Sequence, residues 1–157
     1  MLCASILEII VNDKETIDKC KNNGDNKTIK EIINMLKKMP THCGDETCAS
    51  CVVAGDYIFF AHHAGHNNSN ANDIANQVRN TFESIKRTLS TVNTTLDDIV
   101  EIKFYLKSKN DFSKGRDVFT EYFKNGAPAR MTIFTEFLDD NCLCMLDGIA
   151  YKPNSKI

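Results

Sequence analysis

A single arginine stands where a loop meets a strand-like segment near the end of the sequence. Arg130 follows Pro128 within residues 126–134, and β-branched or apolar residues come after it. An arginine is always charged, and its planar guanidinium binds a carboxylate through two parallel hydrogen bonds. A rigid, proline-containing entry would orient this side chain at the mouth of the strand. Arg130 is therefore either a candidate anchor for a small acid or a surface arginine at a strand start.

Cysteines and histidines form a second group of chemically versatile residues. Their side chains are ligands that zinc accepts, and they occur in the motifs Cys48-x-x-Cys51, His62-His63-x-x-His66 and Cys142-x-Cys144. Alternate residues of a strand share one face, so Cys142 and Cys144 could equally be packed in a core. His62 and His63 would face opposite sides, which argues against a shared ion, and we expect no metal.

His62 could donate a proton near neutral pH or be a hydrogen-bonded strand-end histidine. Cys48 could be a reactive thiol.

Length and composition indicate one globular domain and exclude several classes of protein. The chain has 157 residues, of which 42% are hydrophobic and 25% charged. Its net charge is 19 − 21 = −2, which disfavours binding to nucleic acid by general attraction to phosphate. No apolar run approaches the roughly 18 residues of a membrane helix. Residues 1–11 lack a basic start and a cleavage site, so we expect no signal peptide. The seven cysteines then predict reduced thiols in a cytoplasmic protein.

The pattern divides the chain into an N-terminal extension, residues 1–45, and a domain, residues 46–157. In the extension, Thr28 and Glu31 form a capping-box pattern ahead of a short helix that Pro40 would end. We therefore expect the extension to be partly helical and to pack on the outside of the domain or on a neighbouring subunit.

Within the domain, hydrophobic periodicity predicts strands and helices in the order β-β-α-β-α-β-β. The strands are expected at residues 48–53, 57–61, 99–106, 131–137 and 142–151, and the helices at 73–89 and 111–123. Asn93 would break the first helix, and Asn125 with Gly126 would close the second in a left-handed cap. Tight turns are expected at 55–56 and 139–141. The fold class is α+β, with two helices packed on one face of a mostly antiparallel sheet.

Short sequence motifs, in the order in which they occur along this chain, resemble those of the reactive intermediate deaminases, the RidA/YjgF family that is also called the L-PSP endoribonuclease family. The matching words are GDYIFF at 55–60, residues 77–89, LDDIV at 96–100, YLK at 105–107, NDF at 110–112, residues 119–123, PAR at 128–130 and IAYK at 149–152. They run from Gly55 to Pro153, with the separations of the family. The N-terminal extension, which leads into Cys48 to Cys51, resembles a divergent branch.

The resemblance implies a homotrimer of chorismate mutase-like architecture, with a central barrel and a cleft at each subunit interface. It also implies hydrolysis of 2-imine or 2-enamine acids to 2-keto acids and ammonia, without metal or organic cofactor. Arg130 matches the carboxylate-binding position, and Asp147 matches a glutamate that orients water. The other pocket residues that the resemblance implies are Thr132, His62, Cys48 and Arg116.

Several of these positions depart from the family's pattern. Asp147 is one methylene shorter than glutamate, Cys48 replaces a tyrosine, and Arg116 replaces an asparagine. One alternative is therefore a protein that binds small carboxylates, or acts as a chaperone, without catalysis. Another is an endoribonuclease or translation inhibitor, the role behind the family's older name. The charge balance, and the lack of aromatic residues interleaved with Lys or Arg, disfavour a nuclease.

Overall fold

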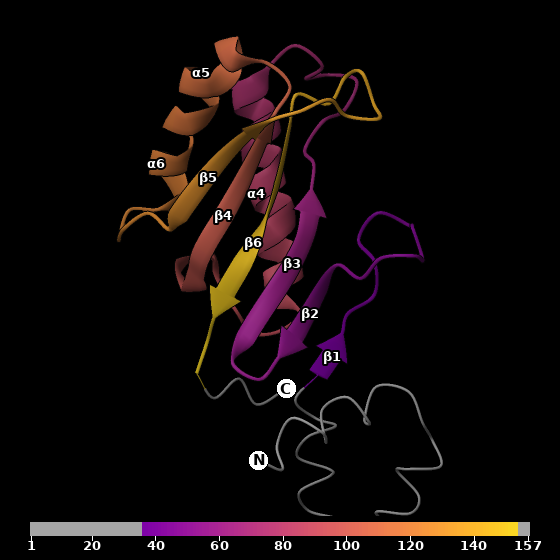
Figure 1. Ribbon diagram of the computed structural model, residues 1–157, viewed down its shortest axis with the longest axis vertical. Coiled ribbons are helices and arrows are strands. Elements are labelled where there is room, and N and C mark those ends of the chain that lie inside the picture. Colours follow the sequence, from indigo (N-terminus) through magenta and orange to yellow (C-terminus); the bar gives the residue numbers. More distant parts are fainter. Residues whose placement is uncertain (1–35, 154–157) are drawn as a thin grey trace, which may run out of the picture. The chain divides into compact units, whose positions relative to one another are not determined.

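The computed structural model describes residues 36–153, which form one layer of strands and one layer of helices (Figure 1). The elements are β1 (Leu36–Lys38), β2 (Cys51–Ala54), β3 (Tyr57–His63), α4 (Ile74–Ser90), β4 (Ile99–Leu106), α5 (Phe112–Asp117), α6 (Phe119–Tyr122), β5 (Ala129–Phe134) and β6 (Cys144–Tyr151), with single 3-10 turns at Leu96–Asp98 and Lys109–Asp111. In this part of the chain, none of the helices combines the length and the apolarity needed to cross a membrane.

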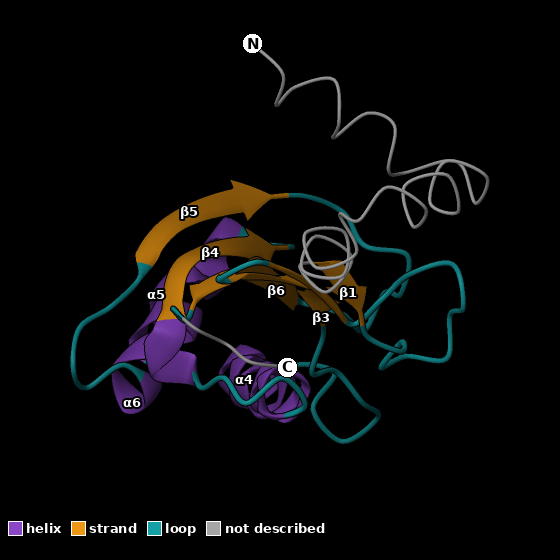
Figure 2. Cartoon of the chain, turned by 90° about the horizontal axis from the view of Figure 1, so that it is seen from below, coloured by secondary structure: helices purple, strands orange, loops and turns teal. Residues whose placement is uncertain are grey.

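The six strands form a single mixed sheet in the order β1-β2-β3-β6-β4-β5. The β2–β3, β3–β6 and β6–β4 pairs are antiparallel, and β4–β5 is parallel. Helices α4, α5 and α6 all lie on the same side of this sheet (Figure 2). The α+β class and the one-sided helical layer are thereby confirmed. The second predicted helix is interrupted at Val118 and becomes α5 and α6.

Helix α4 forms as the sequence pattern predicts. The Asp73 side chain caps its start by accepting a hydrogen bond from the Asn76 amide at 3.1 Å. Its apolar stripe is buried against the sheet, at Ile74, Val78, Phe82, Ile85 and Leu89. Asn93 follows the helix with a φ of 55°, a left-handed conformation that asparagine tolerates. The break predicted there is confirmed.

The structure corrects the predicted boundaries around β1 and β2. The helix expected to end at Pro40 is wrong over Leu36–Lys38, which form β1, and residues 28–35 of it lie outside the described residues. The residue before a proline favours extended backbone, and the Met39 amide donates to the Cys51 carbonyl at 2.9 Å. The strand predicted from residue 48 begins at Cys51, because the Cys48 amide closes a turn onto the Asp45 carbonyl.

The C-terminal boundaries also shift by a few residues. Helix α6 ends at Tyr122, so the cap predicted at Asn125 and Gly126 is wrong: Gly126, with a φ of 132°, lies in the following loop. Strand β5 spans 129–134 in place of 131–137, and β6 begins at residue 144 in place of 142. The turn predicted at 139–141 is confirmed, with the Cys142 amide bonded to the Asp139 carbonyl at 3.0 Å.

One buried polar side chain joins α4 to the two loops beside it. The Gln77 amide nitrogen donates to the carbonyl oxygens of Asn70 and Asn141, at 3.0 and 2.7 Å. Its oxygen accepts from the Leu143 amide at 2.9 Å. Gln77 therefore satisfies three backbone groups that helix or sheet pairing leaves unpaired, and it anchors the chain just before β6.

Replacing Gln77 with leucine should destabilise the domain by about 3 kcal/mol, because the substitution leaves these backbone groups without hydrogen-bond partners in a buried region. Urea unfolding followed by circular dichroism, at one fixed protein concentration, measures the change. The matched control is Lys86→Leu, an exposed position on the same helix, which should stay within about 0.5 kcal/mol of the parent. Equal effects of the two substitutions would contradict this role for Gln77.

Candidate functional site

Arg130 lies on β5, the edge strand, and faces the helical side of the sheet. Its Cα pairs with that of Ile102, whose side chain is buried in the core beneath the helices. The guanidinium carbon is 5.0 Å from the ring centre of Phe119 and 5.8 Å from that of Phe112. These cation–π contacts hold the guanidinium over α5 and α6. The residue as a whole remains exposed, although its charged end packs on the two rings.

A second arginine, itself paired with an aspartate, lies beside Arg130. The guanidinium of Arg116 lies 5.6 Å from the Phe112 ring, on which Arg130 also packs, and forms an ion pair with Asp117 at 2.8 Å. Burial, followed by the charge of Arg116, lowers the pKa of Arg130. Within residues 36–153, no carboxylate pairs with Arg130. An anion bound at this edge would therefore meet a guanidinium that is already oriented and has no competing acidic partner there.

Thr132 belongs to the same group of side chains. Its Cα pairs with that of Phe104, so it follows Arg130 on the helical side of β5. Its side chain is partly buried. We call the set Arg116, Arg130, Thr132, Phe112 and Phe119 the β5 cluster. The structure thus brings three of the predicted pocket residues, Arg130, Thr132 and Arg116, to one edge of the sheet.

Asp147, the other predicted catalytic residue, lies on the opposite face of the sheet. It pairs with Lys103 across β6 and β4, and its Oδ1 lies 3.3 Å from the Lys103 ammonium. Its Oδ2 accepts a hydrogen bond from the Tyr105 hydroxyl at 2.9 Å. Lys103 also lies 3.6 Å from Glu101. Within one protomer, the backbone of the sheet therefore separates Asp147 from the Arg130 guanidinium.

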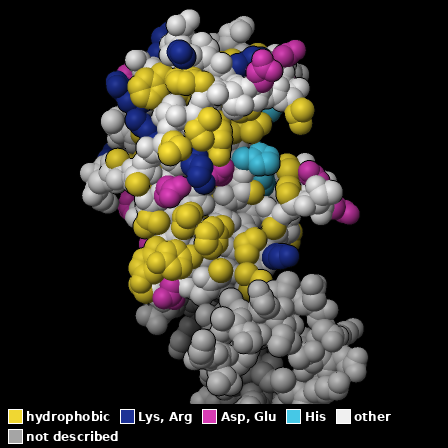
Figure 3. Space-filling view, in the orientation of Figure 1, with side chains coloured by type: hydrophobic (Ala, Val, Ile, Leu, Met, Phe, Trp, Pro, Cys, Tyr) yellow, Lys and Arg dark blue, Asp and Glu magenta, His cyan; other side chains and the backbone are white. Residues whose placement is uncertain are grey.

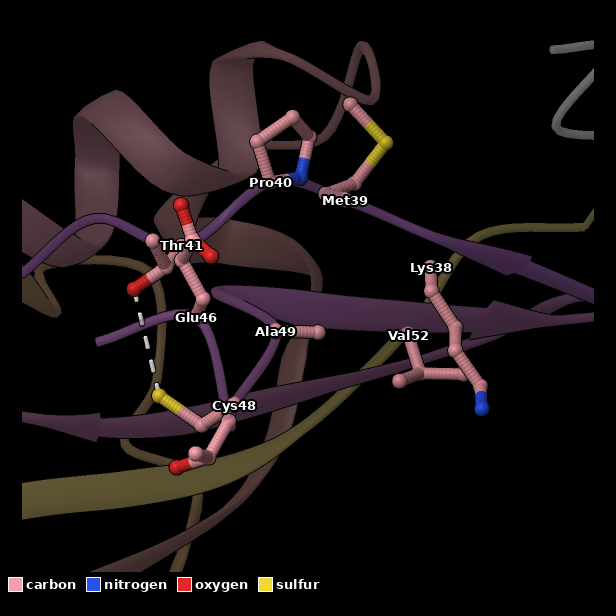
Figure 4. A pocket seen from close by; sticks show the side chains of 9 residues that line it. Lys38, Met39, Pro40, Thr41, Glu46, Cys48, Ala49 and Val52 are labelled. Atoms are coloured by element: carbon pink, nitrogen blue, oxygen red, sulfur yellow. Dashed lines mark hydrogen bonds between the residues drawn. The ribbon is translucent and has the colours of Figure 1, made fainter. Parts of the chain in front are cut away.

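Cys48 and His62 lie towards the other edge of the sheet. Cys48 precedes β2, and His62 is exposed on β3, which β6 and β4 separate from β5. Three strand spacings of about 4.8 Å place β3 about 14 Å from β5. This separation keeps both residues away from Arg130 within the described part of one chain. Cys48 does line a pocket of about 690 Å³ formed by residues 38–41, 46–49 and Val52 (Figure 4).

A histidine pair beside this region was not predicted. The rings of His42 and His63 stack with centres 3.9 Å apart, and His63 Nε2 lies 2.8 Å from the Thr88 hydroxyl. Burial, followed by the neighbouring His42, lowers the pKa of His63 to about 4. His63 is thus a neutral, packed side chain. The only sequence signal for its burial was the alternation between His62 and His63, which the structure confirms.

The cysteine and histidine motifs do not converge within the described chain. Between residues 36 and 153, no group of three or more Cys, His, Asp or Glu side chains is arranged to hold a metal ion. Cys51, Cys142 and Cys144 are buried as packed thiols, and for Cys142 and Cys144 this is the core packing that the strand alternation allowed.

Comparison with known proteins agrees with this architecture. The model of the family described as Endoribonuclease L-PSP matches residues 48–152. A RutC family protein of Pyrococcus horikoshii is 38% identical over 80 residues, which are 51% of this chain and 64% of that protein. The chain thus matches slightly less than two thirds of the length of this relative. A protein of Dermatophagoides farinae named 2-iminobutanoate/2-iminopropanoate deaminase is 25% identical over 49% of this chain and 60% of its own length.

Solved structures show the same fold. A Streptococcus pyogenes protein of the YjgF family superposes with a TM-score of 0.68 at 24% identity, over 76% of this chain and 98% of the other. Because the family model covers more than half of the sequence, the chain belongs to the RidA/YjgF family, also called the endoribonuclease L-PSP family.

Proposed function

We propose that the protein is a deaminase that hydrolyses 2-imine or 2-enamine acids to 2-keto acids and ammonia, at sites shared between the subunits of a homotrimer. The observation that carries this proposal is Arg130, whose guanidinium is oriented on two aromatic rings and pairs with no carboxylate of residues 36–153. The deaminase name of the Dermatophagoides farinae relative supports the reaction class.

Hydrolysis of an imine acid needs an anchor, a proton and a positioned water. The planar guanidinium of Arg130 would bind the substrate carboxylate through two parallel hydrogen bonds, and Arg116 would add positive charge beside it. A carboxylate placed near the imine carbon would orient the attacking water, after which the carbon–nitrogen bond breaks and ammonia leaves. Asp147 has this role in the proposal, with His62 as a proton donor. The substrate class is a small 2-imino acid, and the product is a 2-keto acid.

The separation of these residues supports a shared site. The β5 cluster lies at one edge of the sheet, whereas Asp147, His62 and Cys48 lie on the opposite face or towards the other edge. A cleft between neighbouring protomers can unite them if the β5 edge of one protomer meets the β3 and β6 strands of the next. Each protomer would then supply one half of each site.

The open face of the sheet supports association of several copies. None of the helices within residues 36–153 covers it, and Tyr57, Phe59 and Met131 are 48%, 45% and 60% exposed. Figure 3 shows hydrophobic side chains gathered on this face around charged ones. Apolar patches of this kind mark interaction surfaces. In a trimer, the three open faces would line a central barrel and lose this exposure.

The proposed compartment is the cytoplasm. The five cysteines of the described segment are free thiols, as expected of a protein kept in a reducing environment.

Substituting Arg130 should remove most of the activity. The assay couples the protein to a serine or threonine dehydratase and follows keto acid and ammonia as the imine decays. Arg130→Ala should lower kcat/KM at least about 100-fold, because two charge-assisted hydrogen bonds to the carboxylate are lost. Arg130→Lys keeps the charge but cannot make two parallel hydrogen bonds to the carboxylate, so kcat/KM should fall about tenfold. The matched control is Arg79→Lys. Arg79 lies on α4 and pairs with Glu121 of α6, and this substitution should leave kcat/KM unchanged.

Other results of this assay would favour the alternatives. If the protein does not speed imine decay, yet 2-ketobutyrate raises its melting temperature in an Arg130-dependent manner, it binds carboxylates without catalysis. RNA cleavage that disappears in Arg130→Ala would instead favour the endoribonuclease.

An acidic residue on the open face should break the trimer. Phe59→Asp would bury an unpaired carboxylate in the proposed barrel, so light scattering after size exclusion should show a single chain, whereas the parent protein should show three. Thr120→Asp, on the exposed side of α6, controls for the added charge and should remain trimeric. A monomeric parent protein would contradict the shared site.

A further inference from the structure

A pair of thiols lies in the loop between β1 and β2, towards the opposite edge of the sheet from Arg130. We propose that Cys43 and Cys48 form a redox-active dithiol, which a low-molecular-weight disulfide such as glutathione disulfide converts to a disulfide within this loop. The Sγ atoms of Cys43 and Cys48 lie 4.0 Å apart. Closing the bond brings them to about 2.05 Å, which rotation of the two side chains and a small shift of an exposed loop can supply.

The loop backbone holds the two cysteines together. Gly44 adopts a φ of 80°, which lets the chain reverse directly after Cys43, and open space surrounds it. The Asp45 carboxylate then accepts hydrogen bonds from the amide and hydroxyl of Thr47, at 2.9 and 2.6 Å. The Cys48 amide closes the turn onto the Asp45 carbonyl at 3.2 Å. The approach of the two sulfurs is therefore built into the turn.

Thr41 contacts both thiols. Its hydroxyl lies 3.3 Å from Cys43 Sγ and 3.9 Å from Cys48 Sγ, the contact drawn as a dashed line in Figure 4. A hydroxyl in this position can donate a hydrogen bond to a thiolate and stabilise it. The loop thus provides both the partner sulfur and a hydrogen-bond donor.

The two cysteines differ in reactivity. Cys43 is exposed, and the hydrogen bond from Thr41, followed by the backbone of Asp45, lowers its pKa. Thr41 also acts to lower the pKa of Cys48, but burial and the neighbouring Cys43 and Asp45 outweigh it, so the pKa of Cys48 is raised. The thiolate is the attacking species. Cys43 is therefore the nucleophile, and Cys48 is the resolving thiol.

The other described cysteines react poorly with a disulfide in solution. Cys51, Cys142 and Cys144 are buried in the core. Burial raises the pKa of Cys142 to about 11 and that of Cys144 to about 12. These thiols stay protonated at neutral pH and are shielded from a disulfide in solution.

Thiol–disulfide exchange with glutathione disulfide would proceed in two steps. The Cys43 thiolate attacks one sulfur of glutathione disulfide, forms a mixed disulfide and releases one glutathione thiolate. The Cys48 thiolate then attacks the Cys43 sulfur, closes the Cys43–Cys48 bond and releases the second glutathione. The protein loses two electrons and two protons, and glutathione disulfide is reduced to two glutathione molecules.

The test uses the full chain carrying Cys3→Ser and Cys20→Ser, so that only the described cysteines remain. After incubation with glutathione disulfide and blocking of free thiols, mass spectrometry of tryptic peptide 39–79 should show a loss of two hydrogens. This peptide also contains Cys51. The Cys51→Ala variant should therefore form the bridge as the parent does. Cys48→Ser should accumulate the glutathione mixed disulfide on Cys43.

A second readout separates the roles of the two thiols. In the reduced protein, iodoacetamide should label Cys43 before Cys48 at neutral pH, at least about ten times faster. Lowering the pH should slow labelling of Cys48 first, because its pKa is the higher of the two. The proposal is overturned if Cys51→Ala abolishes the bridge, if Cys48→Ser forms no mixed disulfide, or if both thiols are labelled at the same rate.

Discussion

Successive side chains of a strand point to opposite faces of the sheet, and this alternation decides what Arg130 can reach. Arg130 shares the helical face with Ile102, whereas Asp147 shares the open face with Lys103. No side-chain rotation carries Asp147 through the layer of backbone to the guanidinium in the same protomer. A site built from both side chains has to draw on a second protomer, and this constraint favours a cleft between subunits over a pocket within one.

The orientation of Arg130 depends in turn on the core. Each cation–π contact with Phe112 or Phe119 contributes about 1 kcal/mol at a partly exposed site. Phe119 is itself fixed by edge-to-face and tilted contacts with Phe82 and Phe104, at 5.0 and 5.2 Å between ring centres. The aromatic packing that stabilises the helical layer therefore also positions the charged group at the edge of the sheet. Arg116 lies at the same edge but pairs with Asp117, so the preference of this edge for an anion depends on the charge of Arg130.

Local patterns in the sequence were sufficient for much of the fold. The helical spacing from Ile74 to Leu89 predicts α4, which ends at Ser90, and Asn93 follows it in a left-handed conformation. Alternation predicts that His62 and His63 face opposite sides of their strand, and the structure has His62 exposed and His63 buried. These features depend on residues close in the chain, where side-chain period and backbone preference act directly. The boundaries of β2, α6 and β5 were less accurate, because individual hydrogen bonds, such as that from the Cys48 amide to the Asp45 carbonyl, decide where an element begins and leave no hydrophobic period in the sequence.

The sequence by itself determined most of the strands and helices of the domain, the family and the identity of the candidate anchor, but not β1 or the division of the second helix into α5 and α6. Tertiary structure alone decided which side chains meet: Gln77 with the loops beside α4, His42 on His63, and Asp147 with Lys103 and Tyr105. It also decided that Cys48 faces Cys43 across a turn that Gly44 permits. The physical reason is that strand order and loop conformation set distances between residues far apart in the chain. Those distances follow from the packing of the whole domain and leave no periodic signal in the sequence.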